Sequence, residues 1–233
     1  MRILKWLIGI AVAAVVLVVG GTFVYIHFIE PDPKPPLTLS TVTPTTLGSG
    51  SKAASSTPVA LAGAWKIANG TTVGYRVKEV LFGQDNEATG RTTSVTGGLT
   101  ITGTTVSKAN FTVDMTTVSS DQAQRDNQFQ NRIMDTADFP TATFELTSPI
   151  NFGSEPAIGK HITANATGKL TLHGTTKTVT FPVQAQRRDA QTIEVQGDIP
   201  VTFSDYNIDN PSGGPASVGS SGTLEFLLEL SPS

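Results

Sequence analysis

Residues 162–172 read ITANATGKLTL, and this stretch decides the fold. Small or apolar residues stand at every second position from Ile162 to Leu172, with Thr, Asn and Lys between them. Successive side chains of a β-strand point to opposite faces of the sheet, so the pattern predicts a long strand with one dry and one wet face. His173-Gly174 then predicts a turn, after which the alternation resumes in residues 179–183.

The same alternation recurs along much of the chain and predicts antiparallel strands, about eight or nine in all. It occurs in residues 72–79, 109–116, 179–183, 193–195, 199–203 and 224–230, and further strands are expected within 64–68, 92–106 and 141–150. Long strands with one dry face are typical of a barrel or a sandwich. The sequence therefore predicts an all-β domain.

Residues 121–135 interrupt the strand pattern. They are mostly polar, and Phe129 and Ile133 stand four positions apart, which places both on one face of a helix. Asp121 supplies a capping signal at the start, and the Phe139-Pro140 pair is expected to end the segment. We predict one short helix that covers an end or an edge of the sheet.

The N-terminus predicts a membrane anchor. An almost unbroken apolar run covers residues 3–29, and a helix of this length would span roughly 40 Å, more than the roughly 30 Å hydrocarbon core. Arg2 and Lys5 precede or begin the run, while Glu30 and Asp32 follow it. The positive-inside rule then places the N-terminus in the cytoplasm. A cleaved signal peptide is the alternative, although its apolar stretch usually has only about 7–15 residues.

The chain thus divides into three parts. Residues 1–29 are the predicted single-pass anchor in the cytoplasmic membrane, residues 30–60 are a linker rich in Pro, Ser and Thr, and residues 61–233 are one domain outside the cytoplasm. The domain carries 12 Lys+Arg against 17 Asp+Glu, and this mild acidity gives no reason to expect a nucleic-acid partner.

Composition and motifs argue against catalysis. The chain has no Cys and only three His, so it has no disulfide, thiolate metal site or Cys nucleophile. It contains no G-x-S-x-G, P-loop or H-E-x-x-H pattern. We therefore predict no enzymatic activity, no catalytic residue, no metal and no cofactor.

The pattern leaves the role of the dry face open. Inward-facing apolar side chains can fill a core, but a closed barrel of about eight strands can also hold one small ligand. The polar candidates have two interpretations as well. For Arg125 and Asp126 the structural interpretation is a solvated helix face, or an Arg that holds the helix to the barrel, and the functional one is a contact with a ligand head group. His173 caps a turn or contacts that head group.

Several motifs, in order, resemble the YceI-like family of bacterial lipid- or polyisoprenoid-binding proteins. They extend from Trp65 to Leu230. The most specific is Gly168-Lys169-Leu170-Thr171-Leu172-His173-Gly174-Thr175-Thr176-Lys177, which is similar to G-x-L-T-[LI]-H-G-x-T-[KR]. The others are Trp65-Lys66-Ile67, Gly97-Gly98-Leu99-Thr100-Ile101, Phe111-Thr112-Val113-Asp114-Met115-Thr116-Thr117-Val118, and Arg125-Asp126 followed by Phe139-Pro140-Thr141-Ala142-Thr143-Phe144.

The resemblance implies an extended, lipocalin-like antiparallel barrel with an apolar tunnel. It also implies a periplasmic or secreted binding protein for a polyisoprenoid, a quinone-like lipid or a fatty acid. The expected tunnel lining is Val73, Tyr75, Val77, Phe111, Val113, Met115, Phe144, Leu146, Ile162, Ala164, Ala166, Leu170, Leu172, Phe181, Val183, Phe226 and Leu228. Arg125, Asp126 and His173 are the candidate head-group contacts.

Two features depart from the family pattern. The predicted anchor replaces the cleaved signal of many members, and residues 204–222 form a long segment rich in Gly, Ser and Pro where the family has a loop. The alternative function is a structural or signalling ectodomain with a filled barrel and no ligand. A homodimer is compatible with either function.

Overall fold

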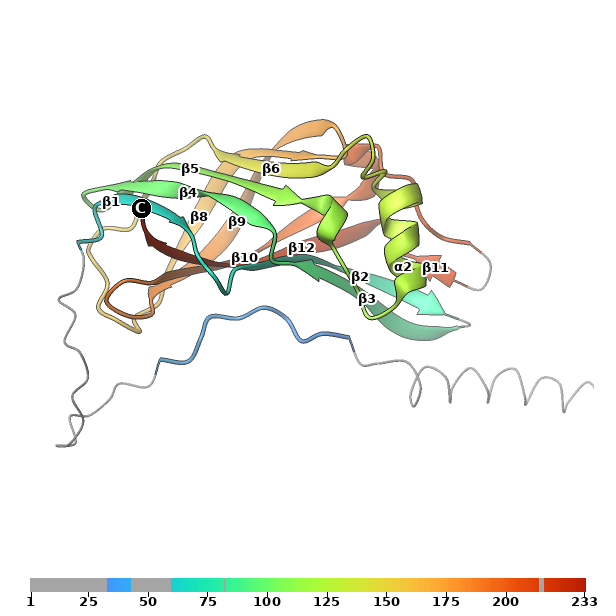
Figure 1. The fold of residues 1–233 in the computed structure, drawn as a ribbon, viewed down its shortest axis with the longest axis horizontal. Helices are drawn as coiled ribbons and strands as arrows, with labels where there is room; N and C mark the ends of the chain where they lie inside the picture. Colours follow the sequence, from blue (N-terminus) through green and yellow to red (C-terminus); the bar gives the residue numbers. More distant parts are fainter. Residues whose placement is uncertain (1–32, 43–59, 82, 214–215) are drawn as a thin grey trace, which may run out of the picture.

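The computed structural model describes residues 33–42, 60–81, 83–213 and 216–233. Twelve strands and four short helical elements make up most of it (Figure 1). The strands are β1 (Gly63–Ile67), β2 (Thr72–Leu81), β3 (Gln84–Thr92), β4 (Val95–Thr102), β5 (Thr105–Asp114), β6 (Thr141–Leu146), β7 (Ile150–Asn151), β8 (Ile162–Leu172), β9 (Thr175–Arg187), β10 (Ile193–Thr202), β11 (Ala216–Val218) and β12 (Ser221–Pro232). The helical elements are η2 (Met115–Thr117), α2 (Ala123–Gln128), η3 (Phe129–Ile133) and η4 (Phe203–Tyr206).

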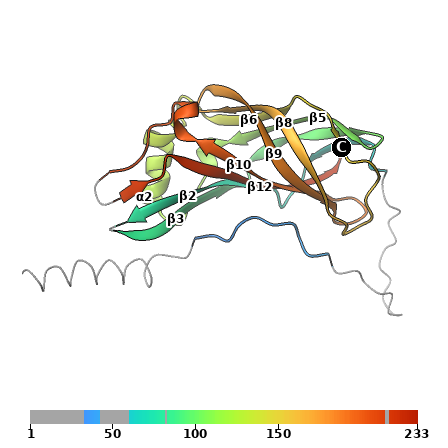
Figure 2. The ribbon, with the colours of Figure 1, turned by 180° about the vertical axis from the view of Figure 1, so that it is seen from behind.

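Eight strands form a closed antiparallel barrel in the order β1-β4-β5-β6-β8-β9-β10-β12, which β12 closes by pairing with β1. Beyond β1, the same edge of β12 pairs with β2, which in turn pairs with β3 and β11. The hairpin β2–β3 therefore extends the wall past one end of the barrel (Figures 1 and 2). The all-β barrel with one short helix is confirmed.

The predicted strand at residues 162–172 is β8, with the same bounds. Its two-residue turn to β9 has a positive φ at both His173 (49°) and Gly174 (70°). This is the conformation of the tight hairpin turns that match the twist of the flanking strands. Leu172 consequently pairs with Thr175, and the register holds along the whole of β8.

The helix lies within the predicted segment, but its ends differ from the prediction. Gln122, not Asp121, is the N-cap of α2, and it makes no side-chain capping bond. Asp121 forms an ion pair with Arg125 one turn later. The π-helical turn η3 continues α2 and ends before Asp135, whose φ of 41° breaks the helix ahead of Phe139-Pro140.

The two ends of the barrel differ in how they are packed. At the end formed by β1 and the last residues of β12, Trp65 and Leu230 are 2% and 0% exposed. They pack with Leu61, Ile101 and Ile193 into a separate apolar cluster. The indole Nε1 of Trp65 donates to the Leu61 carbonyl at 2.9 Å. This end of the barrel, called the closed end below, is sealed by side chains.

No helix among the described residues is long and apolar enough to cross a bilayer. The predicted anchor, residues 1–29, lies outside the described chain, as do residues 43–59 of the predicted linker. The described part of that linker, residues 33–42, extends along the outside of the barrel below β2, β10 and β12 (Figure 1). This part of the predicted tether therefore contacts the domain.

Candidate functional site

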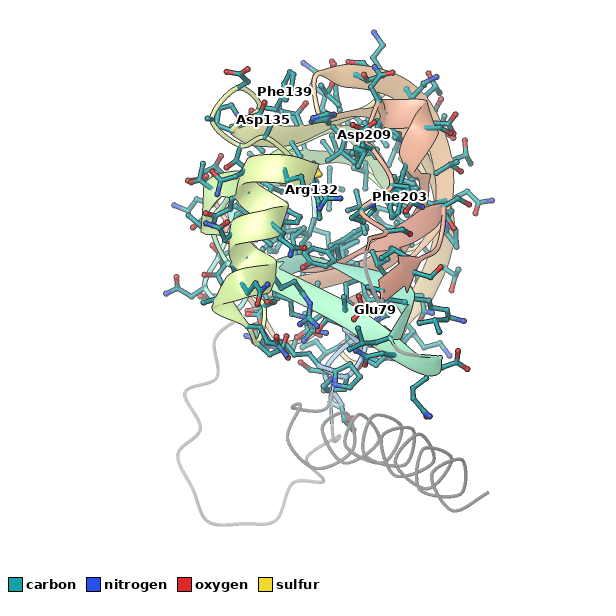
Figure 3. All side chains as sticks on the ribbon, turned by 90° about the vertical axis from the view of Figure 1, so that its right-hand side faces the viewer. Glu79, Arg132, Asp135, Phe139, Phe203 and Asp209 are labelled. Carbon is teal, nitrogen blue, oxygen red and sulfur yellow. The ribbon has the colours of Figure 1, made fainter. Side chains whose placement is uncertain are left out.

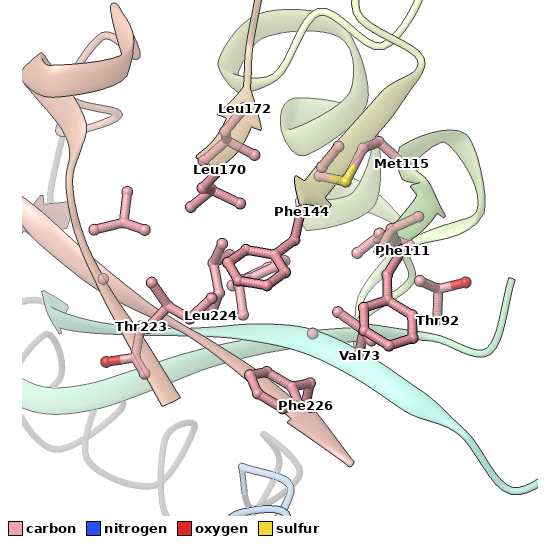
Figure 4. A pocket seen from close by; sticks show the side chains of 18 of the residues that line it. Val73, Thr92, Phe111, Met115, Phe144, Leu170, Leu172, Thr223, Leu224 and Phe226 are labelled. Atoms are coloured by element: carbon pink, nitrogen blue, oxygen red, sulfur yellow. The ribbon is translucent and has the colours of Figure 1, made fainter. Parts of the chain in front are cut away.

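The barrel encloses a cavity of about 440 Å³, which is within the range of about 300–1,000 Å³ that is usual for small-molecule sites. Its walls are the inward-facing side chains of the strands, because alternate residues of each strand turn inward. Figure 4 shows several of them, among them Phe111, Phe144, Leu170 and Leu224, pointing toward a shared space.

All the residues predicted to line a tunnel lie on the wall of this cavity. They are Val73, Tyr75, Val77, Phe111, Val113, Met115, Phe144, Leu146, Ile162, Ala164, Ala166, Leu170, Leu172, Phe181, Val183, Phe226 and Leu228. Only Glu79 and Arg125 are charged among the lining residues of the described chain. A wall of this composition suits an apolar ligand, since an apolar chain needs few polar partners along its length.

Three phenylalanine rings meet in the middle of the wall. Phe181 lies edge-on to Phe144, with ring centroids 5.5 Å apart, and edge-on to Phe226 at 6.0 Å. Glycines let two of these rings lie flat against the backbone: a Cβ at Gly168 would lie 2.4 Å from the Phe144 ring, and one at Gly197 would lie 2.6 Å from the Phe226 ring. The rings consequently lie along the wall and do not have to project across the cavity.

Polar groups gather on the wall at the end away from Trp65, where α2 and the tip of β2 lie (Figure 3). We call this end the mouth. Its polar lining comes from Glu79 on β2 and from Gln122, Gln124, Arg125 and Gln128 on or beside α2. The Arg125 guanidinium lies 3.6 Å from the Glu79 carboxylate and also pairs with Asp121. The mouth therefore carries an ion-paired cluster above an apolar interior.

Tyr75 connects this cluster to the interior. Its ring stacks on Phe129 of η3 with centroids 5.0 Å apart and an angle of 10° between the planes. Burial raises the pKa of the Tyr75 phenol far above its ordinary value of 10.0, although the charge of Arg125 acts in the opposite direction. The phenol is thus neutral at physiological pH and can only donate or accept hydrogen bonds.

The three predicted head-group residues separate in the structure. Arg125 lines the cavity, whereas Asp126 and His173 do not. The Asp126 carboxylate accepts a hydrogen bond from the Ser120 amide at 2.6 Å, which secures the start of the helix. His173 lies in the β8–β9 turn, with Nδ1 3.2 Å from the Tyr206 carbonyl oxygen and its ring edge-on to Phe139.

Sequence reasoning missed part of the wall. Ala88 comes from β3, whose sequence QDNEATGRT lacks an apolar alternation. Glu79, Gln122, Gln124 and Gln128 belong to segments that look solvated in sequence, and only the fold brings them to the mouth. Val195, Ile199, Val201 and Leu224 line the cavity too, and their alternation did mark them as inward-facing.

No set of metal-ligating side chains gathers in the described residues. The two domain histidines are far apart along the fold: His161 precedes β8 and His173 follows it. The described part of the chain therefore offers a binding cavity and no group of metal ligands.

The comparison with protein-family models identifies the same family that the sequence motifs resemble. The model of the YceI-like domain matches residues 65–230, the same range over which the sequence motifs occur. Protein YceI of Escherichia coli O157:H7 is 39% identical over 75 residues, which are 32% of this chain and 35% of that protein. UPF0312 protein VPA0850 of Vibrio parahaemolyticus is 35% identical over 79 residues, 34% of this chain and 38% of that protein. The chain thus matches little more than a third of the length of these curated relatives.

Solved structures share the fold. A polyisoprenoid binding domain from Saccharophagus degradans, implicated in plant cell wall breakdown, superimposes with a TM-score of 0.58 at 17% identity, over 74% of this chain and 99% of that chain. BcnA of Burkholderia cenocepacia gives a TM-score of 0.53 at 22% identity, over 68% of this chain and 95% of that chain. At these identities the likeness establishes the barrel architecture.

Proposed function

The chain belongs to the YceI-like family, and from this premise we propose that its barrel binds a long apolar chain, a polyisoprenoid, a quinone-like lipid or a fatty acid, without chemical conversion. The observation that carries the proposal is the cavity of about 440 Å³ with a mostly apolar wall, whose charged and amide side chains lie at the mouth. That the Saccharophagus degradans domain with this fold is described as polyisoprenoid binding supports the same ligand class.

The cavity favours a carrier over a filled barrel. Protein cores pack to the density of organic crystals, and voids larger than a water molecule are few. A void of several hundred Å³ would leave its lining without contacts, at a cost that rises with cavity size. An apolar ligand restores those contacts, and each buried CH₂ group contributes about 0.8 kcal/mol.

The mouth suits a ligand with a small polar head. A chain that enters with its tail toward Trp65 would leave its head beside Arg125, Gln122 and Gln128. The carboxylates of Glu79 and Asp121 already pair with Arg125. A head group that accepts hydrogen bonds from the glutamine amides therefore fits better than one that carries several negative charges.

We further propose that residues 1–29 anchor the chain in the cytoplasmic membrane, with the barrel on the outer side. The support is the apolar run of residues 3–29, with Arg2 and Lys5 at its start and Glu30 and Asp32 after it. A tethered barrel would hold or pass on its lipid close to the bilayer that contains such lipids.

Native mass spectrometry of the full chain in mild detergent tests the ligand proposal. We expect the protein to have a larger mass than the apoprotein, because a lipid is bound. Organic extraction should remove this added mass, and the extract should contain a long-chain lipid. A clean apoprotein mass, with no uptake of an added fluorescent fatty acid or polyprenol, would favour the structural or signalling ectodomain instead.

A further inference from the structure

Residues 33–42, called the strap below, are bound to the barrel at two places. At the first, Ser40 contacts β10 and β9. Its amide and hydroxyl donate to the Glu194 carboxylate at 3.0 and 2.6 Å, and its carbonyl accepts from Gln186 Nε2 at 2.8 Å. Val42 then lies against Gly159 in the loop before β8.

The second place lies on β2 and β3. Arg76 donates through Nη2 to the Lys34 carbonyl at 2.6 Å, and Arg91 donates to the Pro35 carbonyl. Pro33, Pro35 and Pro36 restrict the backbone to extended conformations, so little conformational entropy is lost when this segment binds in an extended form.

The surface under the strap is built for this contact. Its side chains point away from the cavity, yet Glu194 is 0% and Glu225 is 1% exposed. Glu225 pairs with Arg76 at 3.3 Å and with Arg91 at 2.7 Å, and the same two arginines hold the strap. Buried carboxylates need partners to remain charged. Ser40 of the strap donates two hydrogen bonds to Glu194, so the strap supplies some of the partners that this buried carboxylate needs.

The direction of the strap follows from the strand register. Lys34 lies beside Arg76, which pairs with Thr223 near the mouth end of β12. Ser40 lies beside Glu194, which pairs with Glu229 near the closed end. The strap therefore runs from the mouth half of the barrel toward the closed end, as the blue segment in Figures 1 and 2 shows.

This direction limits where the proposed anchor can lie. The chain from Ile29 to Lys34 can reach at most about 18 Å when fully extended. Lys34 lies level with Arg76 and its strand partner Thr223. The tip of β2 at Leu81 is five residues from Arg76, roughly 17 Å along the strand. The closed end at Pro232 is nine residues from Thr223, roughly 30 Å. Only the mouth end is within reach of a membrane that holds residues 3–29.

We propose that the strap holds the barrel with its mouth against the outer leaflet of the membrane that contains the chain's own anchor, so that a lipid passes directly between bilayer and cavity. The inference rests on the proposed anchor. The mouth also offers an apolar contact, since Val80 is 36% exposed and Leu81 lies partly exposed beside it at the tip of β2. Its carboxylates give no attraction to anionic lipid, so the strap and the anchor must hold it there.

Fluorescence quenching on the reconstituted full chain tests this arrangement. The chain has no Cys, so Ser217→Cys on β11 at the mouth and Thr102→Cys at the closed end each give one labelling site, and both residues are exposed. Each variant is labelled with an environment-sensitive dye in phosphatidylcholine vesicles that contain head-group spin-labelled lipid. We expect several-fold stronger quenching at residue 217 than at residue 102. Equal quenching at the two sites would overturn the inference.

A matched pair of insertions tests the strap itself. A Gly/Ser insert of about 20 residues after Asp32 adds roughly 25 Å of flexible span between anchor and strap, and the same insert after Gly50 leaves that distance unchanged. The first insert should abolish the difference between the two probes, and the second should preserve it. Preservation by both inserts would overturn the role of the strap.

The same samples separate this inference from the proposed function. If the chain fails to sediment with the vesicles after alkaline extraction, the anchor is wrong and the inference fails with it. If the chain sediments and takes up a fluorescent fatty acid, but the two probes are quenched equally, the carrier proposal stands and the orientation alone is wrong.

Discussion

The ring of Tyr75 on β2 stacks on the ring of Phe129 in η3, with centroids 5.0 Å apart and planes 10° from parallel. This contact joins the helical segment α2–η3 to the strand that extends past the barrel. Tyr75, Phe129 and the neighbouring Arg125 all line the cavity. The stability of the mouth and the shape of the ligand site consequently depend on the same side chains.

Removing the Phe129 ring should loosen the helix. Phe129 is 7% exposed, and truncation of a buried Phe to Ala costs about 3–5 kcal/mol. We expect Phe129→Ala to lower the unfolding free energy by an amount near the lower figure, because the cavity already lies beside the ring. Thermal and urea unfolding measure it. Asn127→Ala, on the exposed face of α2, should change stability little. An equal loss in both variants would contradict this role for the stacked pair.

Arg125 should matter for both stability and binding. Its ion pair with Glu79 is mostly buried, with side-chain exposures of 18% and 14%. Arg125 also donates a hydrogen bond to the Asp121 carboxylate, and hydrogen bonds to charged groups contribute about 1.5–3 kcal/mol. We expect Arg125→Ala to destabilise the protein by about the lower figure and to weaken binding of a fluorescent fatty acid. Arg125→Lys keeps the positive charge but loses the planar guanidinium group with its several N–H donors. We expect its losses of stability and of binding to lie between those of the wild type and of Arg125→Ala. An unchanged melting temperature with weakened binding would assign Arg125 to the ligand alone.

The strap should detach in acid. Burial alone would raise the pKa of the Glu194 carboxyl, but the hydrogen bonds from Ser40 and Gln186 and the charge of Arg188 bring it below its ordinary value of 4.5. A carboxyl with a lowered pKa stabilises the bound form fully above its ordinary pKa and loses that contribution as the pH falls through the lowered value. Arg188 also pairs with Glu229 at 2.7 Å, so that carboxylate belongs to the same cluster.

Hydrogen exchange protection of residues 33–42, corrected for the intrinsic pH dependence of exchange, measures strap binding. We expect protection to be constant near neutral pH and to fall only once the pH drops below the ordinary carboxyl pKa of 4.5. Ser40→Ala removes one hydrogen bond to a charged acceptor and should reduce protection at all pH values, while Thr38→Ala, at an exposed position of the strap, serves as the control. Protection that does not change with pH or in Ser40→Ala would show that Glu194 does not hold the strap.

The alternation of apolar residues predicted the cavity wall, because alternate residues of a strand face the same side of the sheet and in this barrel that side faces the cavity. In β8, five of the six residues that alternation marks as inward, Ile162, Ala164, Ala166, Leu170 and Leu172, line the cavity, and the Phe144 ring covers the sixth, Gly168. The sequence did not predict β3, because its residues show no alternation of apolar and polar side chains. Strand β3 is mostly polar, and its place in the sheet comes from its pairing with β2 from Val73 to Leu81.

Tertiary contacts decided the remaining differences. Residues 193–195 and 199–203 look like separate strands, but β10 continues through Gly197, which the Phe226 ring covers. The Pro-rich composition of residues 33–42 predicts a free tether, because such a segment cannot build a core of its own. Its partners Arg76, Glu194 and Gln186 lie on strands far away in the sequence, and no local pattern reveals them.

A matched pair of substitutions on β8 tests the central claim, that the barrel holds an apolar ligand in its cavity. Ala164 lines the cavity, and the neighbouring Asn165 points outward and is exposed. The measurement is a titration of the full chain with a fluorescent fatty acid or polyprenol, with a thermal melt on the same sample. We expect saturable binding in the wild type and in Asn165→Phe, and a folded Ala164→Phe in which the new ring occupies the ligand's space and binding is lost. If the wild type shows no saturable binding and Ala164→Phe is destabilised by about 1–3 kcal/mol, as in an overpacked core, the barrel is filled and the carrier account is contradicted.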